Sequence, residues 1–78
     1  MLHKVRVVRS DDWCALYIDG KKQYENHSIS VGDFFNIVKL KCEKTIIDDI
    51  EYLEVYCNPN WLEEIGNFPT DLSDVVFF

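Results

Sequence analysis

The chain has 78 residues, of which 47% are hydrophobic and 14% aromatic, and this composition favours a single folded domain over residues 1–78 rather than a disordered tail. Fourteen acidic residues against eight basic ones give a formal net charge of −6, which opposes binding to nucleic-acid phosphates. The cysteines Cys14, Cys42 and Cys57 lack the spacing of a disulfide framework or a zinc ribbon, and no apolar run suits a signal peptide or a membrane span. We therefore expect a cytoplasmic protein with neither nucleic-acid nor membrane partners. At this size folding leaves little hydrophobic surplus over chain entropy, so self-association is also considered.

The first half of the chain predicts three strands. Residues 3–8 carry three valines among basic residues, and residues 13–18 are apolar on both faces of a strand. Asp19-Gly20 then predicts a hairpin turn, because glycine accepts the positive φ that such turns need, and residues 21–28 form the returning strand. A strand that is apolar on both faces is normally covered twice, by a helix and by a further layer or a second subunit.

The length of the hairpin loop decides which face each side chain of the returning strand occupies. With an even loop, Tyr24 shares a face with Tyr17 and Trp13, while His27 lies on the face of Cys14. With an odd loop these assignments are exchanged. We expect the even loop, because it gathers the aromatic side chains on one face.

A capped helix follows the hairpin. Ser30 is suited to the N-cap, Asp33 to the first turn, and Ile29 and Phe34 to a hydrophobic staple, which together predict a helix over residues 30–42. Its apolar stripe consists of Val31, Phe34, Phe35, Val38 and Cys42. Residues 43–50 fit either a helical period or a turn.

The second half predicts a strand over residues 51–57, a short helix over residues 60–65 that Asn58-Pro59 begins and Gly66 ends, and a one-turn helix over residues 72–74. The apolar residues 75–78 are expected to dock on a sheet edge of the same chain or on a neighbouring subunit. The predicted fold class is α+β. A small antiparallel sheet, made of the N-terminal strand, the hairpin and the later strand, packs on one main helix, with a short second helix and an apolar C-terminal tail.

Aromatic and polar residues of the hairpin, with one tryptophan from the later helix, form the candidate ligand site. Aromatic rings can stack on a flat ligand, while lysine, histidine and serine can orient phosphate or hydroxyl groups. The set is Trp13, Tyr17, Lys21, Tyr24, His27, Ser28 and Trp61. The same residue types are also enriched in protein interfaces, and we favour an interface between subunits, which is compatible with a ligand pocket.

Catalytic and metal sites are less favoured. Cys14 and His27 are cross-strand neighbours in the even-loop register, but no third orienting group or oxyanion loop accompanies them. Neither His3 and His27 nor the aspartate pairs have a spacing that specifies a metal site, and no glycine-rich phosphate loop is present. We therefore expect a protein that is not an enzyme and has neither a metal nor a cofactor.

Several short motifs resemble a set of short uncharacterised proteins found in bacteria and their phages. These are Trp13, Ala15, Leu16 and Tyr17, then Asp19-Gly20-Lys21, His27-Ser28-Ile29, Trp61-Leu62-Glu63-Glu64 with Gly66, and Pro69 with Leu72-Ser73-Asp74-Val75. The chain departs from the pattern in residues 43–51 and in the polar Lys22 and Gln23. A phage setting implies a role in counter-defence in the host cell cytoplasm.

The resulting functional expectation is a non-enzymatic, homo-oligomeric binding protein of phage type that sequesters a nucleotide-like signalling molecule. The alternative is a protein that inhibits a host defence enzyme by binding to it. A small enzyme that uses Cys14 and His27 is the least favoured of the three.

Overall fold

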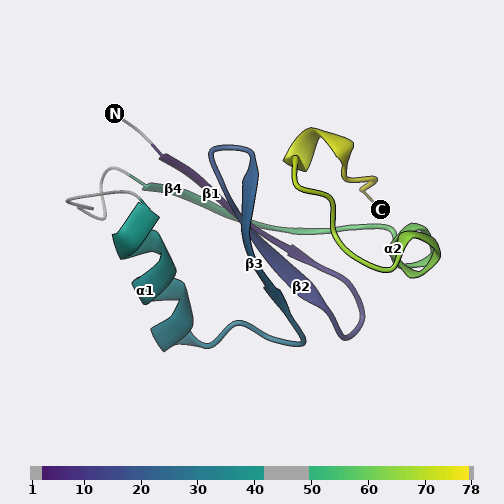
Figure 1. The fold of residues 1–78 in the computed structure, drawn as a ribbon, viewed down its shortest axis with the longest axis horizontal. Helices are drawn as coiled ribbons and strands as arrows, with labels where there is room; N and C mark the ends of the chain where they lie inside the picture. Colours follow the sequence, from purple (N-terminus) through teal and green to yellow (C-terminus); the bar gives the residue numbers. More distant parts are fainter. Residues whose placement is uncertain (1–2, 42–49, 78) are drawn as a thin grey trace.

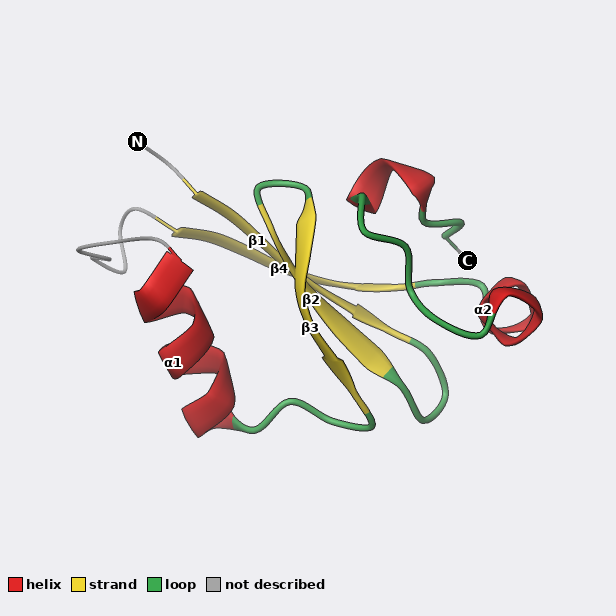
Figure 2. Cartoon of the chain, viewed as in Figure 1, coloured by secondary structure: helices red, strands yellow, loops and turns green. Residues whose placement is uncertain are grey.

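The computed structural model describes residues 3–41 and 50–77 and confirms the α+β class. Its elements are β1 (His3–Arg9), β2 (Cys14–Ile18), β3 (Lys21–Asn26), α1 (Val31–Lys41), β4 (Ile50–Tyr56), α2 (Pro59–Ile65) and the 3₁₀ helix η2 (Leu72–Asp74). The four strands form one sheet in the order β3-β2-β1-β4. Helix α1 lies on one side of this sheet, and α2 lies with the C-terminal segment on the other (Figures 1 and 2).

The sheet is mixed, whereas the sequence predicted an antiparallel one. The hairpin strands β2 and β3 and the pair β1 and β2 are antiparallel, but β4 runs parallel to β1, with His3 opposite Ile50 and Arg9 opposite Tyr56. The hairpin and α1 lie between these two strands in the sequence. A long connection that contains a helix can return the chain to the starting end of β1, which a tight turn cannot do.

The hairpin has the expected even loop, but a β-bulge inverts the faces beyond it. Asp19 and Gly20 both have positive φ, 51° and 86°, and Ile18 lies opposite Lys21. The register then shifts between Leu16 and Tyr17, because Gln23 is an extra residue in β3. As a result, the prediction that Tyr24 shares a face with Tyr17 and Trp13 is wrong, and so is the placement of His27 beside Cys14.

The first core lies between α1 and the sheet. It consists of the buried side chains Val5, Val7, Leu16, Ile18 and Val38, and is called here the α1-side core. Ser30 caps the helix as predicted, since its hydroxyl accepts the Asp33 amide at 3.0 Å. The predicted apolar stripe is wrong at two positions, because Val31 and Phe35 are 73% and 58% exposed. Cys42 and residues 43–49 lie outside the described residues.

The second core covers the other face of β2. Its buried members are Val8, Ala15, Tyr17, Cys57, Leu62, Phe68 and Val75, and it is called here the α2-side core. Leu62 comes from α2, and Phe68 and Val75 come from the segment that follows it. A further layer of the same chain therefore covers Ala15 and Tyr17, and no second subunit is needed on this face.

The C-terminal half folds through the local signals that predicted it. The Asn58 side chain accepts the amides of Asn60 and Trp61 at 3.0 and 3.3 Å, and Gly66 ends α2 with φ of 83°. The tail docks on its own chain, because the Asn58 amide donates to the Val76 carbonyl at 2.9 Å. No helix in the described part of the chain combines the length and the apolar character that crossing a bilayer requires.

Candidate functional site

The structure does not bring the seven predicted ligand residues together on one surface. Tyr17 is fully buried in the α2-side core, whereas Tyr24 packs against the α1-side core on the opposite face of the sheet. Lys21 is exposed and pairs with Asp71. Trp13 and His27 do meet, with ring centroids 4.6 Å apart in an edge-to-face arrangement.

The remaining two predicted residues also lie apart from a common pocket. Ser28 is exposed in the loop between β3 and α1. Trp61 packs against the α2-side core, with its ring centroid 6.4 Å from that of Phe68. The aromatic groups of the hairpin thus serve mainly the packing of the second core.

The polar atoms around Trp13 are engaged within the chain. Its indole Nε1 donates to Glu25 Oε2 at 2.7 Å, and the Phe68 amide donates to the same oxygen at 2.8 Å. Lys22 Nζ donates both to Glu25 Oε1 and to the Phe68 carbonyl, at 2.8 Å each. This network ties the hairpin to the C-terminal segment and leaves Trp13 a structural role.

Cys14 and His27 do not face each other. Cys14 lies on the strand face of Leu16, where its Sγ contacts the Asn26 carbonyl at 3.5 Å, and burial raises the pKa of its thiol. His27 packs against Trp13 on the other face and places Nδ1 3.2 Å from the Asp12 carbonyl oxygen. Among residues 3–41 and 50–77, no three His, Cys, Asp or Glu side chains gather in a possible metal site.

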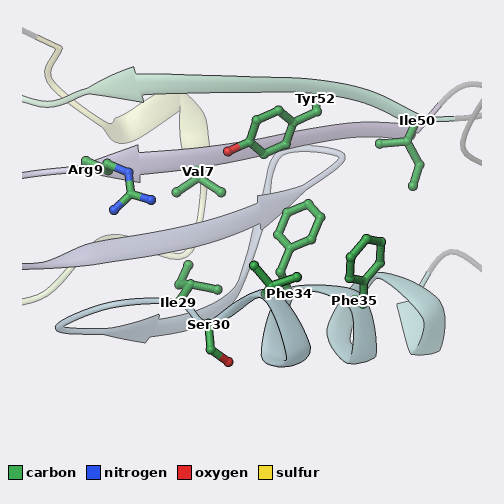
Figure 3. A pocket seen from close by; sticks show the side chains of 9 residues that line it. Val7, Arg9, Ile29, Ser30, Phe34, Phe35, Ile50 and Tyr52 are labelled. Atoms are coloured by element: carbon green, nitrogen blue, oxygen red, sulfur yellow. The ribbon is translucent and has the colours of Figure 1, made fainter.

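A groove lies between the first half of α1 and the strands β1 and β4 and is called here the α1 groove (Figure 3). Its volume is about 450 Å³, which lies within the range of small-molecule sites, roughly 300 to 1,000 Å³. It is lined by Val7, Arg9, Ile29, Ser30, Val31, Phe34, Phe35, Ile50 and Tyr52.

The α1 groove has an aromatic end and a polar end. Figure 3 shows Phe34 and Phe35 of α1 on one wall and Tyr52 of β4 on the opposite wall, with Arg9 farther along, while the Ser30 hydroxyl points away from the groove. The Phe34 ring lies edge-to-face with the rings of Tyr52 and Phe35, at centroid distances of 5.5 and 5.9 Å. A flat ring can therefore pack at one end while a hydroxyl or anionic group meets the guanidinium at the other.

Glu54 sets the electrostatics of the polar end. Its Oε2 lies 3.0 Å from Arg9 Nε and accepts a hydrogen bond from the Tyr52 hydroxyl at 3.3 Å. The hydrogen bond with Glu54 raises the pKa of Arg9, while burial and then the nearby Glu54 charge raise the pKa of Tyr52. The groove thus presents a guanidinium whose charge is partly balanced and a phenol that stays protonated at neutral pH.

Sequence reasoning missed Arg9, Phe34, Phe35 and Tyr52 as site residues. The apolar stripe predicted for the helix includes both phenylalanines, and Tyr52 is predicted only as part of a strand. The available signal is the alternation of this strand, which places Tyr52 and Tyr56 on the same face as Glu54. In comparisons with protein-family models, curated proteins and solved structures, the chain matches none of them.

Proposed function

We propose that this chain is a non-enzymatic, self-associating binding protein of phage type that sequesters a nucleotide-like molecule in the α1 groove. The observation that carries the proposal is the polarity of the groove, in which Phe34 and Tyr52 stand at one end and the Arg9 guanidinium at the other. A nucleotide has the matching pattern, because a flat base and an anionic phosphate are joined by a hydroxyl-bearing sugar.

The charge of the protein restricts the ligand. Glu54 already pairs with Arg9, and the whole chain carries a formal net charge of −6. A triphosphate would be repelled by this negative field, whereas a ligand with one or two negative charges would pair with the guanidinium at a small electrostatic cost. We therefore expect cyclic nucleotides and monophosphates to bind better than triphosphates.

We propose sequestration and not catalysis from the side chains that line the groove. Among the residues that the structure describes, the groove lining supplies no carboxylate, histidine or thiol, and Cys14 and His27 lie on opposite faces of the sheet. The resemblance of the hairpin and α2 motifs to short phage proteins supports a setting in counter-defence, in which the protein lowers the free concentration of a signal in the host cytoplasm.

The test is a titration of the pure protein with cyclic AMP, a cyclic dinucleotide, AMP and ATP, followed by calorimetry and by thermal melting. A ligand at about 100 times its dissociation constant adds roughly 2.7 kcal/mol to the free energy of unfolding, which is a readily measured shift. No heat and no shift with any of these compounds would overturn the nucleotide-like ligand.

Two arginine variants locate the binding site. Arg9 and Arg6 are both on β1 and both pair with glutamates of β4, but they lie on opposite faces of the sheet. We expect Arg9→Gln to weaken nucleotide binding at least tenfold and Arg6→Gln to leave it within a factor of two. Equal losses in both variants would show that the ligand does not use the α1 groove.

A second candidate function is inhibition of a host defence enzyme by direct binding. It is favoured by one observation, the exposed side chains of Tyr52, Leu53 and Tyr56 along the edge strand β4. Affinity capture from a host lysate tests it by comparison of the wild type with Leu53→Arg. A stoichiometric protein that the wild type retains and the variant loses would favour inhibition over sequestration.

A further inference from the structure

The Arg9 side chain lines two cavities of the protein. One is the α1 groove. The other has a volume of about 430 Å³ and is called here the strand-end cavity, because most of its lining residues follow β1 or β4, at the point where these parallel strands end. Its lining consists of Arg9, Ser10, Asp11, Tyr56, Cys57 and Pro59. The two cavities are neighbours, since one side chain borders both.

Two tyrosines of β4 lie on either side of the Arg9 ion pair along the strand. Arg9 pairs with Glu54, and Tyr52 and Tyr56 are the residues two positions before and two positions after this glutamate. Alternate residues of a strand project from the same face, so these three side chains of β4 share the face of the α1 groove. At a rise of about 3.3 Å per residue, the Cα atoms of the two tyrosines are about 13 Å apart. One cation is thus flanked by two aromatic rings.

The Tyr56 ring is accessible to a ligand, since 59% of its surface is exposed. The C-terminal tail joins β4 immediately beyond this residue, where Cys57 bridges Phe77 and the Asn58 amide donates to the Val76 carbonyl. The Cys57 side chain belongs to the α2-side core, so the tail does not bury Tyr56. An exposed aromatic ring at the border of a cavity can stack on a nucleobase.

The Arg9 guanidinium is oriented to meet a phosphate from the groove. Its Nε lies 3.0 Å from Glu54 Oε2, and the remaining N–H donors are on its two terminal nitrogens. Figure 3 shows these nitrogens directed toward the groove. Such a fork matches two oxygens of a phosphate group. Among the described residues that line the two cavities, Arg9 is the only lysine or arginine, which matches a ligand with a single phosphodiester charge at this point.

The charge of Asp11 favours a base over further phosphates in the strand-end cavity. Its carboxylate belongs to the lining of this cavity. A phosphate chain that extended from Arg9 into the cavity would approach a like charge and be repelled. A neutral base can instead donate its amino and ring N–H groups to a carboxylate, which accepts hydrogen bonds.

We propose that the ligand is a dinucleotide, that is, two nucleobases joined through a phosphodiester. The phosphate pairs with Arg9, one base packs at the aromatic end of the α1 groove, and the other stacks on Tyr56 in the strand-end cavity. This inference rests on the proposed function, to which it adds the second base and its site. Linear and cyclic dinucleotides share this chemistry, and the experiment separates them.

Two probes of equal charge isolate the second base. The linear dinucleotide ApA and the methyl ester of adenosine 3′-monophosphate each contain one phosphodiester, but only ApA has a second base. Stacking of one base on an aromatic side chain contributes about tenfold or more to affinity. We therefore expect ApA to bind at least tenfold more tightly than the methyl ester in calorimetric titrations. Equal affinities would overturn the second base site and leave the nucleotide-like ligand of the proposed function in place.

Three variants of β4 locate the two bases. We expect Tyr56→Ala to remove the advantage of ApA and to leave the affinity for the methyl ester within a factor of two. Tyr52→Ala is expected to weaken the binding of both probes. The matched control is Leu53→Ala, because Leu53 is 50% exposed on the same strand but projects from the opposite face, and both affinities should stay unchanged. Circular dichroism checks that each variant is folded.

The remaining outcomes separate this inference from the proposed function. An affinity for ApA that Tyr56→Ala leaves within a factor of two would overturn the stacking site on Tyr56. Cyclic di-AMP is titrated beside ApA, and the form whose tighter binding depends on Tyr56 identifies the ligand as a cyclic or a linear dinucleotide. If neither dinucleotide nor the methyl ester binds, the inference and the nucleotide-like ligand are both overturned.

Discussion

The indole Nε1 of Trp13 donates a hydrogen bond to Glu25 Oε2 at 2.7 Å, across the two strands of the hairpin. The bulge at Gln23 makes this contact possible, because it turns Glu25 onto the face of Trp13 and Tyr17. The carboxylate is largely buried and also accepts the Phe68 amide and Lys22 Nζ. One residue thus joins the hairpin to the segment that covers it.

We expect Glu25→Gln to lower the free energy of unfolding by about 1 to 3 kcal/mol at pH 7, because it weakens hydrogen bonds to a charged, largely buried group. Burial raises the pKa of Glu25, but the hydrogen bonds from Lys22, the Phe68 amide and Trp13 outweigh it, and the pKa lies below its ordinary value of 4.5. The native state therefore binds fewer protons than the unfolded state. The contribution of Glu25 to the free energy of unfolding is complete above about pH 4.5 and is lost as the pH falls through the pKa of Glu25 in the native state.

Urea denaturation of the wild type and Glu25→Gln between pH 7 and pH 3 measures this contribution. The hydrogen bond from His3 also lowers the pKa of Asp19, so the stability of the wild type alone mixes several carboxylates. The difference between the two proteins isolates Glu25. If the difference in unfolding free energy between the two proteins stays constant from pH 7 to pH 3, the lowered pKa of Glu25 in the native state is contradicted.

We expect Tyr17→Phe to destabilise the protein by about 1 to 3 kcal/mol, since it leaves a carbonyl without its partner at almost unchanged packing. The Tyr17 hydroxyl donates to the Pro69 carbonyl at 2.5 Å, and burial raises the pKa of Tyr17 above its ordinary value of 10.0. The unfolded state therefore ionises first, and this residue makes stability fall as the pH rises above 10. Denaturation of both proteins at pH 7 and above pH 10 should show that the gap between them narrows at high pH.

Phe68 and Phe35 allow the same substitution to be compared in a core and at the α1 groove. Phe68 is 2% exposed and Phe35 is 58% exposed. We expect Phe68→Ala to cost about 3 to 5 kcal/mol because it opens a cavity in the α2-side core, and Phe35→Ala to cost less than about 1 kcal/mol. Similar losses in chemical denaturation would mean that Phe35 packs in the core as the helical stripe predicted.

The hairpin turn is expected to depend on the conformation of Gly20. Its φ is 86°, and a Cβ at this position would meet no atom within 4 Å, so the cost of substitution is backbone strain alone. We expect Gly20→Ala to lower stability by about 1 kcal/mol. Gly20→Asn should cost less than half as much, because asparagine adopts left-handed backbone more readily. Equal melting temperatures for the two variants would argue against this strain.

The sequence by itself determined the elements whose signals act over a few residues. Asp19-Gly20 makes the turn, Ser30 caps α1, and Asn58 and Gly66 begin and end α2. Each of these residues satisfies a neighbouring backbone group or adopts a local backbone angle, so its effect does not depend on the rest of the fold. The order of the elements and the α+β class followed from them.

Only the tertiary structure decided which side chains meet. The hydrophobic pattern of the sequence does not reveal that Gln23 is an extra residue in β3. This bulge places Tyr24 on the face opposite to that of Tyr17 and packs the His27 ring against the Trp13 ring. The parallel pairing of β4 and the exposure of Phe35 depend on how segments far apart in the chain pack on one another. For that reason the predicted aromatic residues are divided between the two cores, and the α1 groove is lined in part by Phe34 and Phe35, which the sequence pattern assigns to packing.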